Sequence, residues 1–137
     1  MNNDVLLNKI STIERCIKRI NEVYEGSPSS LEDFTKQDSI ILNIQRACKA
    51  SIDIAMYLVA SQKLGTPQTS RDAFDFLESN HIIDKNLAQK MKSMIGFRNI
   101  AVHDDQNVNL QIVQSIVENH LSDFFQFTKT VLKHKFN

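Results

Sequence analysis

The chain has 137 residues, enough for one domain with a proper hydrophobic core. Three glycines, two prolines, no tryptophan and mainly aliphatic apolar residues favour an all-α helical bundle over a β-sandwich or a barrel. Because 16 basic residues balance 16 acidic ones, no overall positive field marks a nucleic-acid-binding protein, and any such contact must come from a local patch.

Apolar residues at three- and four-residue spacing predict five helices. No repeat, low-complexity tract or flexible linker interrupts them, so residues 1–137 are expected to form a single domain. In chain order the helices run from about Asp4 to Tyr24, from Thr35–Asp38 to Lys63, from Ser70 to Ser79 with Ser70 as N-cap, from Lys85 to Val102, and from Val108 to His134 with Asn107 as N-cap.

The two cysteines, Cys16 and Cys48, lie within apolar helical patterns and are too few for a disulfide framework. They are interpreted as buried thiols of a protein in the reducing cytosol. Neither a signal peptide nor an apolar run long enough to span a bilayer is found, so a soluble, cytoplasmic protein without membrane contact is expected.

The second helix is apolar around most of its circumference, which predicts a central position in the bundle. On one of its faces, however, Asn43, Arg46, Asp53 and Tyr57 recur at helical spacing. Because a buried charge needs a partner, Arg46 and Asp53 are expected to engage each other, a neighbouring helix or a second subunit. Two interpretations stay open: a structural polar seam, or a phosphate-binding cleft that Arg46 lines.

The stretch Arg98-Asn99-Ile100-Ala101-Val102-His103 places a fixed cation five residues before a titratable imidazole. Positions five apart on an ideal helix are separated by ~140°. Arg98 and His103 therefore converge only if the helix ends near Val102, or if the arginine uses its length. The following run of Asp and Asn residues favours such an end.

With that geometry the motif suits cleavage of RNA without a metal. His103 would act as general base on a ribose 2′-hydroxyl or as general acid on the departing 5′-oxygen. Arg98 would hold the scissile phosphate, and Asn99 would orient the imidazole or the phosphate. Since the reaction needs both an acid and a base, a symmetric homodimer that joins two motifs is a mechanistic expectation.

The spacing Arg-x4-His also arises often by chance, and a lone surface histidine is usually inert. The other histidines, His81, His120 and His134, are expected to be solvated. No residues at ligand spacing suggest a metal site, and no cofactor or DNA contact is expected.

Four segments of the chain together closely resemble the HepT family, the HEPN-type toxins of bacterial type VII toxin–antitoxin pairs. The similarity covers nearly the whole chain and is far more specific than the six-residue motif. The segments are Phe34–Ser39, Asn43–Cys48 with Ile52–Ala55, Leu64–Arg71, and Ile95–Asp104.

The resemblance implies a helical bundle that dimerises into a composite, metal-independent ribonuclease site, with Arg98 and His103 as catalytic residues. It also implies a partner, an MntA-like nucleotidyltransferase antitoxin, that silences the toxin by transferring AMP onto a tyrosine. The family pattern is Arg-x4-His-x-Tyr, and this chain has Asp105 at the tyrosine position.

A carboxylate at position 105 lacks the hydroxyl that accepts AMP. As a hypothesis, its charge raises the pKa of His103, repels RNA and attenuates the nuclease; alternatively, the site tolerates it and antitoxin binding alone provides control. Whether Asp105 is natural or introduced stays open. The function from a different class is a non-catalytic HEPN protein that binds a minimal nucleotidyltransferase.

Overall fold

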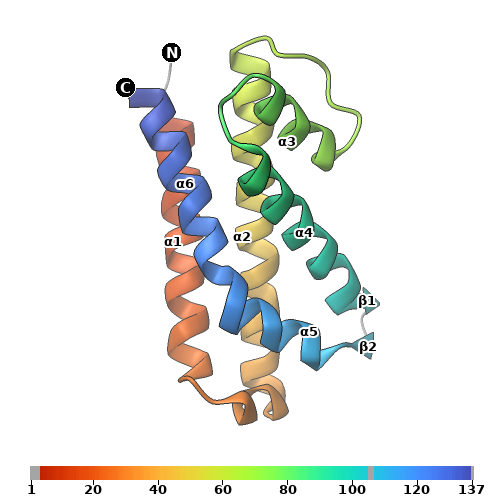
Figure 1. Ribbon diagram of the computed structural model, residues 1–137. Helices are drawn as coiled ribbons and strands as arrows, with labels where there is room; N and C mark the ends of the chain where they lie inside the picture. The colour runs from red at the N-terminus through yellow and green to blue at the C-terminus, as the bar shows by residue number, and fades with distance from the viewer. Residues whose placement is uncertain (1–3, 105–106, 137) are drawn as a thin grey trace.

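The computed structural model describes residues 4–104 and 107–136. Helices dominate it, and the expectation of an all-α fold is confirmed apart from one short hairpin. Helix α1 (Asp4–Tyr24) begins and ends where periodicity predicts. It lies antiparallel to α2 (Phe34–Ser61), and the described ends of the chain lie close together at the same end of the bundle (Figure 1).

A short 3-10 helix, η1 (Pro28–Glu32), connects α1 to α2 and was not predicted. Its end positions Asp33, whose side chain accepts a hydrogen bond from the backbone N–H of Lys36 at 3.1 Å. Asp33 therefore caps α2, and the helix begins one residue before the predicted range. An acceptor at this position satisfies one of the free N–H groups of the first turn.

The central position of α2 is confirmed. It packs against α1, α3 (Ser70–Ser79), α4 (Lys85–Ala101) and α6 (Leu121–Phe136). Its buried residues include Ile40, Ile44, Ala47, Cys48, Ile54, Ala55, Leu58 and Val59. One side stays open nevertheless, because Leu42 and Met56 are 44% and 39% exposed, whereas the sequence predicted apolar burial nearly all round.

Helix α3 has the predicted bounds but a different cap. The side chain of Thr69, not Ser70, accepts from the backbone of Asp72, and the Asp72 carboxylate accepts in return from the backbone N–H of Thr69. This reciprocal capping box satisfies two of the free N–H groups at the start of the helix. Before α3, Gly65 adopts φ +153° so close to the ring of Phe76 that no side chain would fit.

Helix α4 begins after Asp84, whose carboxylate accepts from the N–H of Leu87 at 2.8 Å, and it ends at Ala101. A short antiparallel hairpin then follows, formed by β1 (Val102–Asp104) and β2 (Asn107–Val108), where only the end of the helix was predicted. The N–H of Asn109 also donates to the carbonyl of Ala101. The hairpin therefore brings the chain back beside the end of α4 (Figure 1).

The fifth predicted helix is divided. Helix α5 (Leu110–Ser115) is capped by Asn109 rather than Asn107, and its start moves accordingly. A π-helical turn, η2 (Ile116–His120), separates α5 from α6. A π turn holds one extra residue per turn and so changes which side chains face the core, a feature that periodicity alone does not show.

Candidate active site

The predicted motif lies at the end of α4, and its arginine sits on the boundary between core and surface. Arg98 is half-buried, and its Nη1 donates to Oδ1 of Asn99 at 3.1 Å. Its Nε is fully buried and has no hydrogen-bond partner among the described residues. A buried guanidinium with an unused donor is costly unless something else accepts that hydrogen bond.

The helix end required for convergence of Arg98 and His103 is present. Helix α4 stops at Ala101, and the backbone of His103 lies in β1, directly after the last helical turn. The side chain of His103 and the whole of Asp105 lie outside the described residues, so their predicted roles remain predictions.

Arg98 shares a groove with residues of α1 and α2 that are remote in sequence. The groove has a volume of about 290 Å³ and brings together the predicted site residues Arg46, Asp53 and Arg98. Asn99, by contrast, is not among its lining residues and is exposed. The lining comprises Lys9 and Thr12 of α1, Leu42, Gln45, Arg46, Lys49, Ala50 and Asp53 of α2, and Arg98 of α4.

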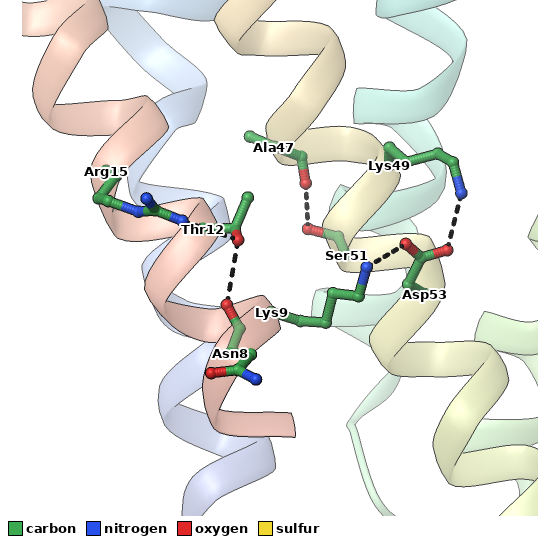
Figure 2. Close-up of polar contacts among 8 residues, drawn as sticks. All are labelled: Asn8, Lys9, Thr12, Arg15, Ala47, Lys49, Ser51 and Asp53. Carbon is green, nitrogen blue, oxygen red and sulfur yellow. Dashed lines mark hydrogen bonds and ion pairs between the residues drawn. The ribbon is translucent and has the colours of Figure 1, made fainter. Parts of the chain in front are cut away.

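Asp53 is the carboxylate that this lining contains, and it does not pair with Arg46. Its two oxygens accept hydrogen bonds from Lys9 of α1 and from Lys49 one turn earlier on α2, each at 3.0 Å (Figure 2). Desolvation raises the pKa of Asp53, but the two lysines outweigh it and hold that pKa below its ordinary value. Of the three predicted possibilities, Asp53 therefore engages a neighbouring helix.

The groove has an excess of positive charge. Among the described residues of the lining, four cations, Lys9, Arg46, Lys49 and Arg98, face one carboxylate, which the two lysines already occupy. No carboxylate of the described chain pairs with Arg46 or Arg98. Two guanidinium groups are therefore available for an anion, and guanidinium matches the geometry of a phosphate.

The stem of Arg98 borders a small apolar hollow on its other side. Side chains from α2, α4, α5 and η2 line it, among them Ile44, Ala101 and Ile116. The nearby thiol of Cys48 is buried, which raises its pKa to about 12 although the charge of Arg98 opposes this. Burial likewise raises the pKa of the Cys16 thiol. Both cysteines are free and buried, as predicted, and neither provides a thiolate nucleophile.

The expectation that His120 is solvated is wrong. Its ring packs against Phe97 with the centroids 5.1 Å apart, and its Nδ1 lies 3.1 Å from Oδ2 of Asp123. The ring contact between His120 and Phe97 joins η2 to the residue that precedes Arg98. The spacing of three between His120 and Asp123 was visible in the sequence, but the π turn that directs it towards α4 was not.

The tyrosines do not replace the missing motif tyrosine. Tyr24 is 4% exposed, and its hydroxyl donates to the carboxylate of Glu118 in η2. Burial and the hydrogen bond to Glu118 raise the pKa of Tyr24 to about 12. Tyr57 is half-buried and lines no part of the groove. No pattern in the sequence indicates the Tyr24–Glu118 contact, which joins residues 94 positions apart.

Within the described ranges, no group of three His, Cys, Asp or Glu side chains lies close enough together to hold a metal ion. The part of the chain that the structure describes also contains no helix that is long and apolar enough to cross a membrane.

The chain is similar in sequence to a curated mRNA nuclease and in sequence and fold to solved HEPN toxins. The curated mRNA nuclease HepT of Shewanella oneidensis is 52% identical over 129 residues, which cover 94% of this chain and 97% of that protein. A solved structure of the tri-AMPylated Shewanella oneidensis HEPN toxin in complex with MNT antitoxin superposes with a TM-score of 0.88 at 52% identity, covering 97% of this chain and 99% of that one.

A second solved structure, of the toxin–antitoxin with AMP-PNP, also gives a TM-score of 0.88 at 52% identity and covers 96% of this chain and 99% of that one. The family model described as ribonuclease HepT-like matches residues 13–131. The resemblance stated from the sequence segments is confirmed: the chain belongs to the HepT-like ribonuclease family.

Proposed function

We propose that this chain is the toxin of a cytoplasmic toxin–antitoxin pair and cleaves RNA without a metal ion, as a homodimer, with Arg98 and His103 as catalytic residues. The observation that carries the proposal is the position of Arg98. It lies in a groove with an excess of positive charge, and its Nε is buried and has no hydrogen-bond partner among the described residues. It precedes by three residues the end of the helix that leads to His103.

The reaction is a transesterification at phosphorus. One His103 takes the proton from a ribose 2′-hydroxyl, and the 2′-oxygen forms a bond to the phosphorus while the bond to the 5′-oxygen breaks. Arg98 binds the phosphate oxygens and stabilises the negative charge that grows on them. An acid returns a proton to the 5′-oxygen, leaving a cyclic phosphate and a free 5′-hydroxyl.

The acid is the reason for proposing a dimer. One motif supplies one histidine, and two motifs across a two-fold axis supply the base and the acid. Leu42 lines the groove and is 44% exposed, and Ile100, two residues after Arg98 on α4, is 58% exposed. Large exposed apolar side chains of this kind are available for burial in an interface.

The partner proposed from the relatives is an MntA-like nucleotidyltransferase antitoxin. The solved Shewanella oneidensis toxin carries AMP groups and is bound to its MNT antitoxin. In this chain Asp105 occupies the position of the motif tyrosine, and Tyr24 is buried. We therefore infer that AMP is not added at position 105 and that control relies on binding.

A second candidate function is a non-catalytic HEPN subunit that binds a nucleotidyltransferase. The aspartate favours it, since a fixed negative charge two residues from His103 repels a phosphate. The retained pair of Arg98 and His103 favours the nuclease, because an adaptor has no need of it.

RNA cleavage by the purified chain in excess EDTA tests the proposal, beside His103→Ala and Asp105→Tyr. The proposal predicts cleavage that survives the chelator and disappears in His103→Ala. A silent chain with an active Asp105→Tyr variant would identify the aspartate as an off switch. If all three proteins are folded and none of them cleaves RNA, the result would favour the second candidate function, the non-catalytic HEPN subunit.

A further inference from the structure

A second hollow continues the groove along the two longest helices. It has a volume of about 290 Å³ and is lined by Thr12, Arg15, Cys16 and Arg19 of α1 and by Asn43 and Arg46 of α2. Thr12 and Arg46 also line the groove that contains Arg98. The two hollows therefore form one continuous surface, hereafter the α1–α2 band, from Arg98 past Arg46 to Arg19.

The band concentrates cations in a chain whose formal net charge is zero. Its basic residues are Lys9, Arg15, Arg19, Arg46, Lys49 and Arg98. Arg15 and Arg19 are exposed. Because the formal charge of the whole chain is zero, the residues outside the band carry a net negative charge, and the cluster is a local field rather than a property of the whole surface.

The cations at the far end of the band are poorly neutralised. Arg15 contacts the hydroxyl of Thr12 at 3.4 Å (Figure 2) and, within the described ranges, no carboxylate. Arg19 approaches Glu22 only at 3.9 Å, and both of these side chains are more than half exposed. An exposed ion pair of this kind contributes little to stability, so Arg19 is available to bind another anion in place of Glu22.

We propose that the α1–α2 band binds the sugar-phosphate backbone of single-stranded RNA next to the phosphate that is cleaved. The inference rests on the proposed nuclease function and adds to it the path of the substrate away from Arg98. From Lys9 to Arg19 the band follows α1 for ~15 Å, at ~1.5 Å per residue, which is long enough for several phosphates.

The chemistry of the lining favours the backbone over the bases. The described residues that line the two hollows include no aromatic ring on which a base could stack. They offer guanidinium and ammonium groups with the hydroxyl of Thr12 and the amide of Gln45, the groups that contact phosphate and sugar. The band is therefore expected to bind RNA with little preference for sequence.

Binding of a fluorescent 16-nucleotide single-stranded RNA tests the band separately from catalysis. The measurement uses full-length His103→Ala protein, so that the RNA stays intact, and compares Arg15→Ala/Arg19→Ala with Lys18→Ala/Lys85→Ala. Both pairs remove two exposed cations, but the two lysines line neither hollow. The band predicts roughly tenfold weaker binding for the arginine pair alone, and a salt-dependence slope smaller by about 1.4 for two lost phosphate contacts.

Cleavage by chains with intact His103 gives the second measurement. The ratio of kcat/KM for the 16-nucleotide RNA to that for a tetranucleotide should fall roughly tenfold in Arg15→Ala/Arg19→Ala and stay constant in the lysine pair. An unchanged ratio together with equal RNA affinity in both pairs would overturn the band while leaving the nuclease intact.

The remaining outcomes separate the two proposals. If the chain binds RNA through Arg15 and Arg19 but never cleaves it, the nuclease fails and the band stands. If Arg15→Ala/Arg19→Ala lowers the affinity for an acidic protein partner but leaves the affinity for RNA unchanged, the band is a protein-binding surface and the RNA proposal is wrong.

Discussion

Helix α4 has two halves with opposite properties. From Lys85 to Ile95 its apolar side chains are buried, including Leu87, Met91 and Met94 at 1% exposure each. In its last turns Phe97 and Arg98 are half-buried, Asn99 is exposed and Ile100 is 58% exposed. The first half follows the rules of a core helix, and the second half departs from them.

The difference indicates where, along α4, residues that stabilise the fold are followed by residues of the candidate site. A buried, unpaired Nε destabilises an isolated domain, and an exposed isoleucine contributes little to its core, so stability alone accounts for neither. Local violations of this kind are expected at functional sites. The opposing π turn, η2, is a third irregularity at the same end of α4.

The largest effect is expected for Arg98→Ala. Loss of the phosphate contact should lower kcat/KM by about 10²–10³-fold, the range found when one donor to a developing charge is removed. The free energy of unfolding should change by only about 1 kcal/mol, because the lost stem packing is offset by removal of a buried, unpaired donor. RNA cleavage assays and urea unfolding check the two parts.

Arg98→Lys provides the control, since it keeps the charge without the planar fork and should recover activity only in part. A large loss of stability in Arg98→Ala would contradict the view that this half of α4 serves the site rather than the fold.

The same division explains what the sequence could predict. The bounds of α1, the central position of α2 and the first half of α4 follow from apolar spacing, because burial there is regular. The caps at Asp33, Thr69 and Asn109 were missed because neighbouring residues are equally suitable by type. Only the backbone conformation at the boundary distinguishes them.

The candidate site shows a different limit. The motif itself was visible, and so was the shared face of Arg46 and Asp53 on α2. Periodicity within one helix does not show which residues of another helix it meets. The meeting of Arg46 with Arg98, and of Asp53 with Lys9, depends on how α2 crosses α4 and α1. The position of His120 depends in addition on the π turn.

The second prediction concerns the first half of α4, from Lys85 to Ile95, whose apolar side chains are buried. Met91→Ala removes a side chain that is 1% exposed and should lower the free energy of unfolding by about 3 kcal/mol through lost burial and a cavity. Urea unfolding measures this loss. Cleavage per folded molecule should stay at the level of the parent chain, and a drop in it as large as that for Arg98→Ala would show that the two halves are not separable.

The third prediction concerns the contact that fixes η2 to α1 opposite the motif. Tyr24→Phe should destabilise the fold by about 1 kcal/mol at neutral pH, because Glu118 loses a donor. The folded pKa of Tyr24 is raised to about 12 from 10.0, so its contribution is present below pH 10 and is lost as the pH rises towards 12.

Unfolding of both proteins by urea across that pH range is the measurement, with the variant as the reference for all other groups. The difference in stability between the two proteins should shrink above pH 10. A constant difference would show that the Tyr24–Glu118 contact does not contribute in the expected way.

The smallest effect is expected at the boundary between the two halves. Gly96 lies inside α4, and among the described residues a Cβ added there would meet only Nη1 of Arg71 at 3.8 Å. Gly96→Ala should therefore stabilise the fold by about 0.5–1 kcal/mol through helix propensity alone. Gly65→Ala is the opposite case, since its Cβ would lie 2.5 Å from the Phe76 ring, and it should destabilise the fold. Thermal unfolding of both variants measures these changes.

If Gly96→Ala is more stable but cleaves RNA poorly, the glycine serves the approach of RNA or of a second subunit, and the functional half of α4 begins at residue 96. Lower stability in Gly96→Ala would contradict the space seen around it.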